Sequence, residues 1–337
     1  MTDRQISLDA ARDLVARAFQ HCGASADNAR ATAAALVRAE ADGQKGHGLS
    51  RVASYSAQLK TGKVNGDARP AVTQPAPGAI LIDAENGFAY PAIDRAIEAL
   101  TPLAASQGIA AAAIRRSHHF GQAGAHVERL AERGLVALLF GNSPKAIAFW
   151  GGAEPMMGTN PIAFAAPTPS AAPLVIDLAV SVAARGKILA AQKSGGPIPE
   201  GWALDADGAP TTDPDSALQG SMAPMGGAKG AALALMVEVL AAALTGGAFG
   251  FEASSLFTGE GAPPDLGQAI VAIDPTVFSG GAYDARMAVL AAAIDGVDGA
   301  RRPGDSRLAK RAQAEREGIV VADALYREIA ALAGEAA

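Results

Sequence analysis

The chain has 337 residues, which is enough for one large domain or two modest ones. Half of the residues are hydrophobic but only 5% are aromatic, and alanine and glycine are abundant, as in ordinary α/β enzymes that pack through small side chains. The net charge of −6 and the lack of any run of basic residues argue against nucleic acid or an anionic membrane as the main partner.

Several features concern the location of the protein. The single cysteine, Cys22, excludes an intrachain disulfide framework and is typical of a reducing cytoplasm. The N-terminal sequence MTDRQISLDA is polar and shows no signal peptide. The longest apolar run, residues 230–244, is interrupted by Glu238 and is short for a membrane span. We therefore expect a soluble, cytoplasmic protein.

The predicted elements begin with a helical region. Residues 7–62 predict three helices, with Ser7 and Ser25 as caps of the first two and Gly23 as the stop between them. The proline-rich segment 67–78 marks a change of architecture. Strands then alternate with helices, which predicts an α/β layer structure. Strands are expected at 79–83, 108–114, 135–140, 162–166, 174–177 and 269–273, helices at 91–105, 122–133, 182–192, 229–244, 282–295, 306–317 and 322–333, and a surface loop at 194–216.

The first candidate site is the segment 42–55, DGQKGHGLSRVASY. His47, Arg51 and Tyr55 are spaced at i, i+4 and i+8, so a helix from Gly48 onward would place them on one face. An imidazole, a guanidinium and a phenol together suit a small organic acid, because they supply a proton donor, a carboxylate clamp and an amphipathic wall. The alternative is a solvent-exposed helix that carries a histidine by chance.

Four common enzyme classes lack support from sequence motifs. No G-x-G-x-x-G follows a predicted strand, and neither G-x-x-x-x-G-K-[ST], H-E-x-x-H nor G-x-S-x-G occurs. The five histidines show no zinc-ligand spacing, and a single cysteine forms no C-x-x-C pair, so no metal site is predicted.

Two turns are candidates for binding an anion or a substrate. The segment 117–121, SHHFG, follows a predicted strand and opens a helix, whose exposed amides favour an anion. The alternative is a helix cap with two polar loop histidines. Thr159 and Asn160 precede Pro161, which fixes a turn at a strand edge from which both side chains can project. The alternative there is a purely structural turn.

Three further segments carry polar groups at ends of elements. Asp177 ends a strand and could hold a ribose hydroxyl or cap the following helix. The glycines of segment 226–230, GGAKG, allow close approach of backbone to a ligand, and Lys229 adds a charge; the alternative is a flexible turn. Arg301, Arg302 and Arg307 surround a turn, either as a phosphate site or as solvated charges.

Taken in order, these segments resemble the malate/L-lactate dehydrogenase family that lacks a Rossmann fold, over nearly the whole chain. The matching stretches are DGQKGHGLSR, SHHFGQAG, GNSPKAIAFWGG, MGTNPIAFAAP, VIDLAVSVAARGKI, IPEGWALDADGAPTTDP, GGAKGAALALMVEVLAAALTGG and RRPGDSR. Within the family, SHHF, GTNPIAFAAP, DADGAPTTDP and LAAALTGG are most similar to the Δ1-piperideine-2-carboxylate/Δ1-pyrroline-2-carboxylate reductases.

The resemblance implies a homodimeric NAD(P)H-dependent oxidoreductase with an α/β fold. A discontinuous helical domain (1–75 plus 296–337) would accompany a mixed-sheet NAD(P)-binding domain (76–295). By position in the motifs, His47 would be the proton donor and Arg51 the carboxylate anchor. Tyr55, Thr159 and His119 would also contact the substrate. The residues implied to hold the cofactor are His119, Phe120, Gly121, Gln122, Ala123, Ser143, Asp177, Leu178, Ala179, Lys229, Gly230, Arg302, Gly304 and Arg307.

Two positions depart from the family pattern. The family usually has a serine where Gly46 stands, and the piperideine reductases have an aspartate where Lys187 stands. A Ser–Asp relay therefore cannot be built from these positions, although Lys187 is typical of the wider dehydrogenase family. One explanation is that water or another group orients His47. The other is that the reaction needs less acid assistance, because a cyclic imine is already partly protonated.

The sequence thus predicts NAD(P)H-dependent reduction of Δ1-pyrroline-2-carboxylate or Δ1-piperideine-2-carboxylate to L-proline or L-pipecolate. NADPH is favoured over NADH because Arg301, Arg302 and Arg307 could meet a 2′-phosphate. The main alternative is a 2-hydroxy-acid dehydrogenase of the malate, lactate or ureidoglycolate type that uses the same residues on a C=O group. A second alternative is a catalytically silent dimeric binding protein.

Overall fold

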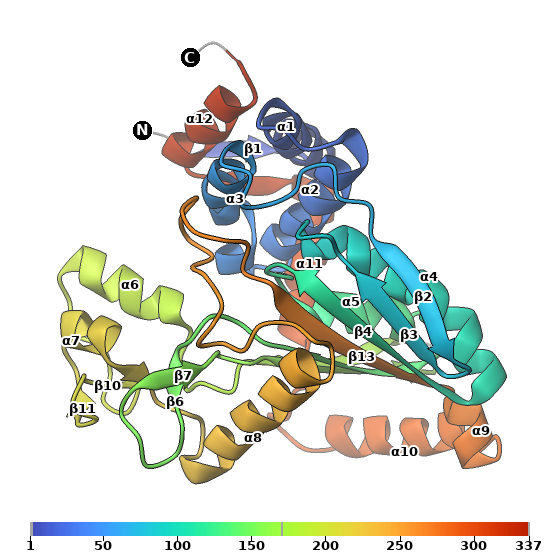
Figure 1. Cartoon of the computed structure of the whole chain (residues 1–337). Coiled ribbons are helices and arrows are strands. Elements are labelled where there is room, and N and C mark those ends of the chain that lie inside the picture. Colours follow the sequence, from blue (N-terminus) through green and yellow to red (C-terminus); the bar gives the residue numbers. More distant parts are fainter. Residues whose placement is uncertain (1–2, 170, 336–337) are drawn as a thin grey trace.

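The computed structural model describes residues 3–169 and 171–335, and it brings the two ends of the chain together (Figure 1). β1 (Arg4–Ile6) pairs antiparallel with β14 (Ile319–Val321). One apolar core contains Phe19 and Leu36 from the start of the chain and Ile329 from its end. The helices around this core are α1 (Leu8–His21), α2 (Ala26–Ala41), α3 (Val52–Lys60), α11 (Asp305–Glu317) and α12 (Asp323–Leu332).

The serine caps predicted for the first two helices are confirmed. Ser7 Oγ accepts a hydrogen bond from the amide of Ala10 at 3.2 Å, and Ser25 Oγ accepts one from the amide of Asn28 at 3.4 Å. Each hydroxyl therefore satisfies an amide that the first helical turn leaves without an intrahelical acceptor.

A seven-stranded mixed sheet forms the centre of the molecule, in the order β2-β3-β4-β13-β5-β8-β9. Only β3 and β4 run parallel, and the other neighbours are antiparallel. This arrangement confirms the predicted α/β class with a mixed sheet. The strands are β2 (Ala71–Ala76), β3 (Ala79–Asp83), β4 (Ile109–Ser117), β5 (Val136–Gly141), β8 (Ile162–Thr168), β9 (Ala171–Leu178) and β13 (Leu266–Ile273).

Two helices cover the sheet and close a second apolar core. α4 (Ala89–Gln107) connects the parallel strands β3 and β4, and α5 (Ala123–Ala131) connects β4 and β5. Their apolar faces meet Ile82, Ile114 and Leu139 of the sheet. α9 (Pro275–Ser279) and α10 (Tyr283–Asp295) then lead back towards α11, and α10 buries none of its residues (Figure 1).

A third region carries short strands and three helices around its own core of Ile147, Val180, Ile188 and Met222. The segment 194–216, expected to be a surface loop, contributes two strands and part of a helix here, because Ile198 and Ala203 are buried. The elements are β6 (Ile147–Ala148), β7 (Pro155–Met157), β10 (Ala203–Leu204), β11 (Pro210–Thr211), β12 (Ser221–Met222), α6 (Arg185–Ser194), α7 (Pro214–Gln219) and α8 (Ala228–Glu238).

Two segments differ from the sequence expectation. The proline-rich segment contains β2, which is exposed along its whole length at the edge of the sheet, where Pro75 removes no hydrogen bond of an inner ladder. The apolar helix predicted at 229–244 is α-helical only as far as Glu238 and continues as a π-helical turn, Val239–Ala243. Among the described residues, no helix combines the length and the hydropathy that crossing a membrane requires. The division into two domains stays a prediction.

Candidate functional site

The segment around His47 is held by the end of α2. Two 3-10 turns, Lys45–His47 and Leu49–Arg51, replace the predicted helix start and lead directly into α3. The carboxylate of Glu40 accepts a hydrogen bond from the amide of Leu49 at 2.9 Å. A Cβ at Gly48 would lie 2.2 Å from that carboxylate, so this position accepts only glycine without a shift of Glu40.

Four aromatic side chains form a continuous hydrogen-bonded series, which we call the histidine–tyrosine chain: His47, His119, Tyr55 and Tyr90. His47 Nδ1 lies 3.2 Å from His119 Nε2, and His119 Nδ1 lies 2.5 Å from the hydroxyl of Tyr55. The Tyr55 hydroxyl lies 3.2 Å from that of Tyr90. The planes of the two imidazoles differ by only 14°. His119 therefore joins two residues of the predicted His47–Arg51–Tyr55 set by bonding with both ring nitrogens.

The members of this chain are neutral near pH 7. Burial, and then the charge of Arg51, lower the pKa of His47 to about 4. The same two causes hold the pKa of His119 well below its usual value. Burial raises the pKa of Tyr55 to about 12 and that of Tyr90 well above its usual value. Each neutral member of this chain can both donate and accept a proton, so a proton can pass along the chain without breaking an ion pair.

The Arg51 guanidinium has its contacts outside the histidine–tyrosine chain, yet it lies near enough for its charge to lower the pKa of His47 and of His119. Its Nε donates to the carbonyl oxygen of Gly46 at 2.7 Å, and its guanidinium carbon lies 4.8 Å from the centroid of the Phe257 ring. Arg51 and Phe257 line a cavity of about 640 Å³ together with Lys193 of α6. No acidic side chain lines this cavity among the described residues, so its charge is positive.

Lys63 fixes the loop that carries Phe257. The lysine is 2% exposed, and its Nζ donates to the carbonyl oxygens of Ser255, Thr258 and Glu260 at 2.6, 3.2 and 2.7 Å. Burial lowers the pKa of Lys63. The ammonium therefore holds the backbone of this loop beside Arg51.

His118, the other histidine of the SHHFG segment, has a structural environment. Its Nε2 lies 2.5 Å from Oε1 of Gln58, and burial is the first cause that lowers its pKa to about 3. Gln58 in turn donates to the carbonyl oxygen of Leu256 at 2.9 Å. The two adjacent histidines thus differ in role: His118 supports the 255–260 loop, whereas His119 contacts His47.

The Thr159 turn is built on one buried carboxylate. Glu238, which is 3% exposed, accepts hydrogen bonds from the amides of Gly158 and Gly250 at 3.1 Å each and from Nδ2 of Asn160 at 2.9 Å. Asn160 has a positive φ of 43°, a strained conformation that these contacts stabilise. Thr159 is oriented by Ser143, whose Oγ accepts from the Thr159 amide at 3.0 Å. Asn160 is therefore structural, while Thr159 and Ser143 lie together as predicted partners of a ligand.

The start of α5 and the end of β9 bring together another part of the predicted set. The carboxylate of Asp177 accepts a hydrogen bond from the amide of Gly124 at 2.7 Å. A Cβ at Gly124 would lie 2.9 Å from the Cβ of Asp177, so a glycine is required there. Asp177 thus caps α5, and not the helix that follows it in sequence. Gly304 packs on this strand next to Asp177, since a Cβ there would lie 3.4 Å from the carbonyl oxygen of Val175.

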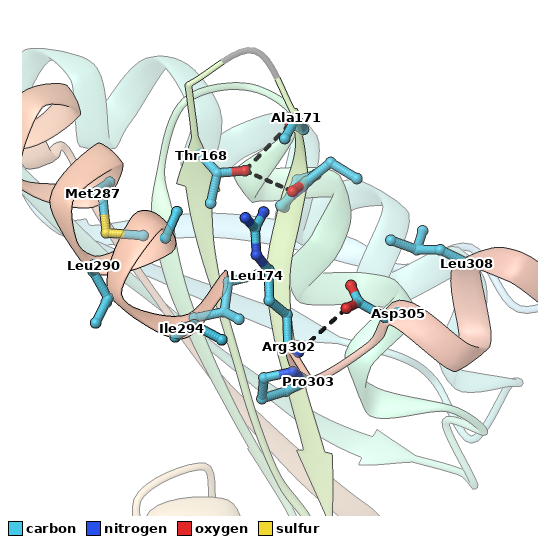
Figure 2. A pocket seen from close by; sticks show the side chains of 13 residues that line it. Thr168, Ala171, Leu174, Met287, Leu290, Ile294, Arg302, Pro303, Asp305 and Leu308 are labelled. Atoms are coloured by element: carbon cyan, nitrogen blue, oxygen red, sulfur yellow. Dashed lines mark hydrogen bonds between the residues drawn. The ribbon is translucent and has the colours of Figure 1, made fainter. Parts of the chain in front are cut away.

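A pocket of about 140 Å³ lies between this strand, α10 and the turn before α11 (Figure 2). Arg302 and Asp305 line it opposite the apolar side chains of Leu290 and Ile294. Asp305 accepts a hydrogen bond from the Arg302 amide at 3.2 Å, and the Arg302 guanidinium donates to Asp295.

Arg307 is committed to a buried ion network, which we call the arginine cluster: Arg38, Arg307 and Arg311 around Asp42 and Glu128. Arg307 bonds Glu128 at 2.7 and 3.0 Å and Asp42 at 3.1 Å. Arg311 bonds both carboxylates at 2.6 to 3.3 Å, and Arg38 bonds Glu128. The predicted phosphate contact of Arg307 therefore competes with two carboxylates inside the protein.

Lys229 and Gly230 open α8, on the other side of the Thr159 turn. The amide of Val180 donates to the carbonyl oxygen of Thr159 at 2.8 Å, and the amide of Met225 donates to the carbonyl oxygen of Val180 at 2.8 Å. A Cβ at Gly230 would lie 2.2 Å from the carbonyl oxygen of Met225, so glycine is required. Lys229 is exposed. No hydrogen bond joins this group to the histidine–tyrosine chain among residues 3–169 and 171–335.

Sequence reasoning missed three residues of the site. Glu238 was noted only as an interruption of an apolar run, yet a carboxylate inside an apolar helix signals buried donors. Tyr90 and Lys63 belong to no recognised motif. Tyr90 contacts Tyr55, which lies 35 positions before it, and Lys63 contacts Ser255, which lies 192 positions after it. Spacing along the chain does not reveal either contact.

Comparisons with known proteins identify the family of the chain. The sequence pattern described as malate/L-lactate dehydrogenase matches residues 6–330. The (2R)-3-sulfolactate dehydrogenase (NADP(+)) of Chromohalobacter salexigens is 50% identical over 98% of each chain, and a Δ1-pyrroline-2-carboxylate reductase of Ancylobacter novellus is 40% identical over 92% of each. The crystal structure of Δ1-piperideine-2-carboxylate reductase from Pseudomonas syringae is 40% identical, covers 98% of this chain and 99% of its own, and superimposes with a TM-score of 0.93. The chain belongs to the malate/L-lactate dehydrogenase family and is an oxidoreductase.

Proposed function

We propose that the protein is an NADP(H)-dependent dehydrogenase of a small 2-hydroxy acid that carries a second anionic group, of the 3-sulfolactate type. The observation that supports this substrate class is the cavity beside the 3-10 turns, where Arg51 and Lys193 supply two positive charges and the lining carries no carboxylate among the described residues. A dianion needs two cations in the same site, whereas a cyclic imino acid carries a single carboxylate. The relative from C. salexigens, which is 50% identical, is named for this chemistry.

In this reaction His47 and Arg51 divide the work. Arg51 binds the carboxylate and orients the C2 atom, since a guanidinium pairs with a carboxylate through two parallel hydrogen bonds. His47 gives a proton to the oxygen of the 2-oxo acid, or takes one from the 2-hydroxy acid in the opposite direction. The loss of serine at position 46 does not leave His47 without a partner, because Nδ1 of its ring lies 3.2 Å from His119. This contact suits C=O chemistry, in which an alkoxide requires an acid.

The residues at the start of α5 fit a dinucleotide. Gly121 has a positive φ of 66°, and Gly124 approaches Asp177 too closely for any side chain, so the two glycines fix the turn that presents the first amides of α5. We assign cofactor binding to residues 119–123, Asp177 to Ala179, Ser143, Lys229 and Gly230, and to Arg302 and Gly304 of the turn before α11, whereas Arg307 is held by the arginine cluster. When bound, the nicotinamide supplies the hydride. The relative named for NADP(+) supports NADP(H) as the cofactor.

A substrate panel tests the proposal. Oxidation of 3-sulfolactate and reduction of 3-sulfopyruvate with NADP(H) are expected to exceed the turnover of lactate, pyruvate and the two cyclic imino acids. Lys193→Gln should raise KM for 3-sulfolactate about fivefold, because it removes one exposed charge contact. Lys187→Gln on the same helix is the matched control, since the Lys187 ammonium lies 5.5 Å from the centroid of the Trp202 ring. Faster reduction of a cyclic imino acid than of every 2-oxo acid in the panel would refute the substrate class.

Arg51→Met tests the first anion site in the same assay. Removal of a charged, two-pronged contact should raise KM between about 10-fold and 100-fold for every acid in the panel. An unchanged KM would show that Arg51 does not bind the substrate carboxylate.

Reduction of a cyclic imino acid is the second candidate, and it is the activity predicted from the sequence motifs. It is favoured by the 40% identical pyrroline-2-carboxylate reductase and by the superposition with the piperideine-2-carboxylate reductase. Arg51 and His47 would keep the same roles on a C=N group. The panel decides between the two substrates with one protein preparation.

The homodimer and the cytoplasmic location stay predictions. The exposed apolar side chains Leu235, Val239 and Leu244, at 49%, 52% and 65% exposure, form a surface on α8 and the π-helical turn that supports self-association. Light scattering coupled to gel filtration tests the dimer.

A further inference from the structure

We infer that the histidine–tyrosine chain conducts protons between a water-filled cavity at Tyr90 and the ring of His47. The inference rests on the proposed role of His47 as proton donor and holds for a C=O or a C=N substrate. His119 and Tyr55 then act on the substrate through His47, and Tyr90 is the end that exchanges with water.

The hydrogen-bond donors along this chain can be ordered in two opposite directions, because each hydroxyl and each neutral imidazole can donate or accept. If Tyr90 donates to the Tyr55 oxygen, the Tyr55 hydroxyl is free to donate to Nδ1 of His119. His119 is then protonated on Nε2 and donates to Nδ1 of His47. His47 consequently carries its proton on Nε2, the nitrogen that His119 does not contact. In this direction the chain gives His47 the tautomer that a proton donor needs.

The far end of the chain reaches a cavity of about 270 Å³ between α2, α4 and α5, which Tyr90 and Gln122 line. Gln122 is 5% exposed, and neither atom of its side-chain amide has a hydrogen-bond partner within the described part of the chain. Buried amides without protein partners are usually bonded to water, and the space here is large enough for several water molecules. Arg129 and Asp94, joined at 2.6 Å, also line this cavity and give it a polar wall.

The proton balance closes with water as the only additional reactant. The substrate oxygen or nitrogen takes the Nε2 proton of His47 as the C=O or C=N electron pair moves onto that atom. His47 Nδ1 takes the proton of His119 Nε2, and His119 Nδ1 takes that of Tyr55. Tyr55 takes the proton of Tyr90, and water in the cavity restores it, so that one proton enters from solvent for each hydride transferred. Both imidazoles are then protonated on Nδ1, and they return to the Nε2-protonated form before the next reduction. Oxidation of a hydroxy acid runs the same series outwards.

The neutral state of all four groups agrees with this order. The low pKa of His47, about 4, and the raised pKa of Tyr55, about 12, disfavour a charge resting on either residue. Protons therefore shift together along the chain, and no ion pair accumulates inside it.

Tyr90→Phe and Tyr55→Phe test the inference, because each variant keeps the ring and removes only the hydroxyl. Tyr326→Phe is the matched control: Tyr326 packs on the same terminal core but is not part of the chain. Both chain variants should lower kcat about tenfold, with KM changed less than twofold, and should reduce the solvent deuterium isotope effect on kcat. The control should keep the kcat, the KM and the isotope effect of the unaltered protein. Values of kcat within twofold of the unaltered protein in both chain variants would overturn the proton path.

A second measurement does not depend on activity. Nitrogen-15 NMR of the unaltered protein should show His47 protonated on Nε2 and unprotonated on Nδ1 between pH 6 and pH 8, with this preference lost in Tyr55→Phe. A proton on Nδ1 of His47 in the unaltered protein would overturn the inference. If no acid of the panel is turned over, the proposed function fails, and the NMR result still decides whether the chain orients His47.

Discussion

The histidine–tyrosine chain and the arginine cluster are both buried polar networks, and they differ in charge. In the arginine cluster, bonds from Arg307 and Arg311 outweigh burial and lower the pKa of Glu128 to about 2, so its members stay ionised. In the histidine–tyrosine chain, burial keeps every member neutral. The charged network joins α2, α5 and α11 and cannot release a proton near pH 7, whereas the neutral one can. Burial therefore produces a fixed support in one place and a proton path in the other.

The largest expected effect comes from the active end of the neutral network. His47→Ala should lower kcat by about 10²- to 10⁴-fold with little change in KM, because it removes the proton donor and leaves Arg51 in place. Steady-state kinetics with the best substrate of the panel measure this. His21→Ala, at an exposed histidine, should keep the kcat of the unaltered protein. A kcat within threefold in the His47 variant would contradict the assignment.

Breaking the charged network should affect stability. Glu128→Gln leaves Arg38, Arg307 and Arg311 with a weakened partner in a buried site, at a cost of about 3–5 kcal/mol in the free energy of unfolding. Glu98→Gln, which breaks only the exposed pair with Arg95, should cost less than about 0.5 kcal/mol. Urea unfolding of both variants measures the contrast, and equal losses would show that the buried network gives no special support.

Lowering the pH from 7 to 5 should destabilise the fold through its buried histidines. The pKa values of His118 and His126 fall to about 3 and about 4 in the folded chain, so the unfolded chain takes up protons below about pH 6.5 that the folded chain does not. Each histidine should therefore cost about 2 kcal/mol of stability between pH 7 and pH 5. Glu128 does not contribute in this window, because its stabilisation is lost only as the pH falls below about 4.5.

Comparison with one histidine variant isolates that effect. His126→Gln keeps a donor for the carbonyl oxygen of Phe120, which His126 Nε2 contacts at 2.8 Å, and should show about 2 kcal/mol less loss over the same pH range. Urea unfolding at the two pH values measures the difference. An identical pH dependence in the variant would contradict the neutral state of His126.

The smallest effect is expected from restoring the serine of the family pattern. A Cβ at Gly46 meets no atom within 4 Å, so Gly46→Ser fits without strain. Because His119 already occupies Nδ1 of His47, the new hydroxyl should change kcat less than twofold. A tenfold gain in kcat would show that His47 lacks a working partner in the natural sequence.

Much of the fold could be predicted from local patterns. The alternation of short apolar strands and amphipathic helices identified the strand at 79–83 with its observed bounds and located most inner strands of the sheet. Segments whose structure depends on pairing or packing that their own residue pattern does not show were missed. β2 contains proline and is recognisable only when β3 pairs with it, and β10 and β11 need the core around Ile198 to become strands.

The candidate site shows the same limit. Spacing suggested that His47 and Tyr55 belong to one site, and the structure joins them through His119, a residue 64 positions beyond Tyr55. The charge of Arg307 suggested phosphate, because a sequence does not show that Glu128, 179 positions away, already pairs with it. Short-range motifs thus identify reactive groups, while long-range pairing decides which of them remain available to a ligand.

The attachment of the 255–260 loop by Lys63 has a consequence for how such an enzyme changes in evolution. Lys63 bonds only carbonyl oxygens, which every amino acid possesses. Mutations can therefore replace Phe257 and its neighbours without detaching the loop. Substrate preference can diverge by single substitutions in this loop while His47 and the fold stay the same, which agrees with relatives named as a sulfolactate dehydrogenase and as a pyrroline-2-carboxylate reductase.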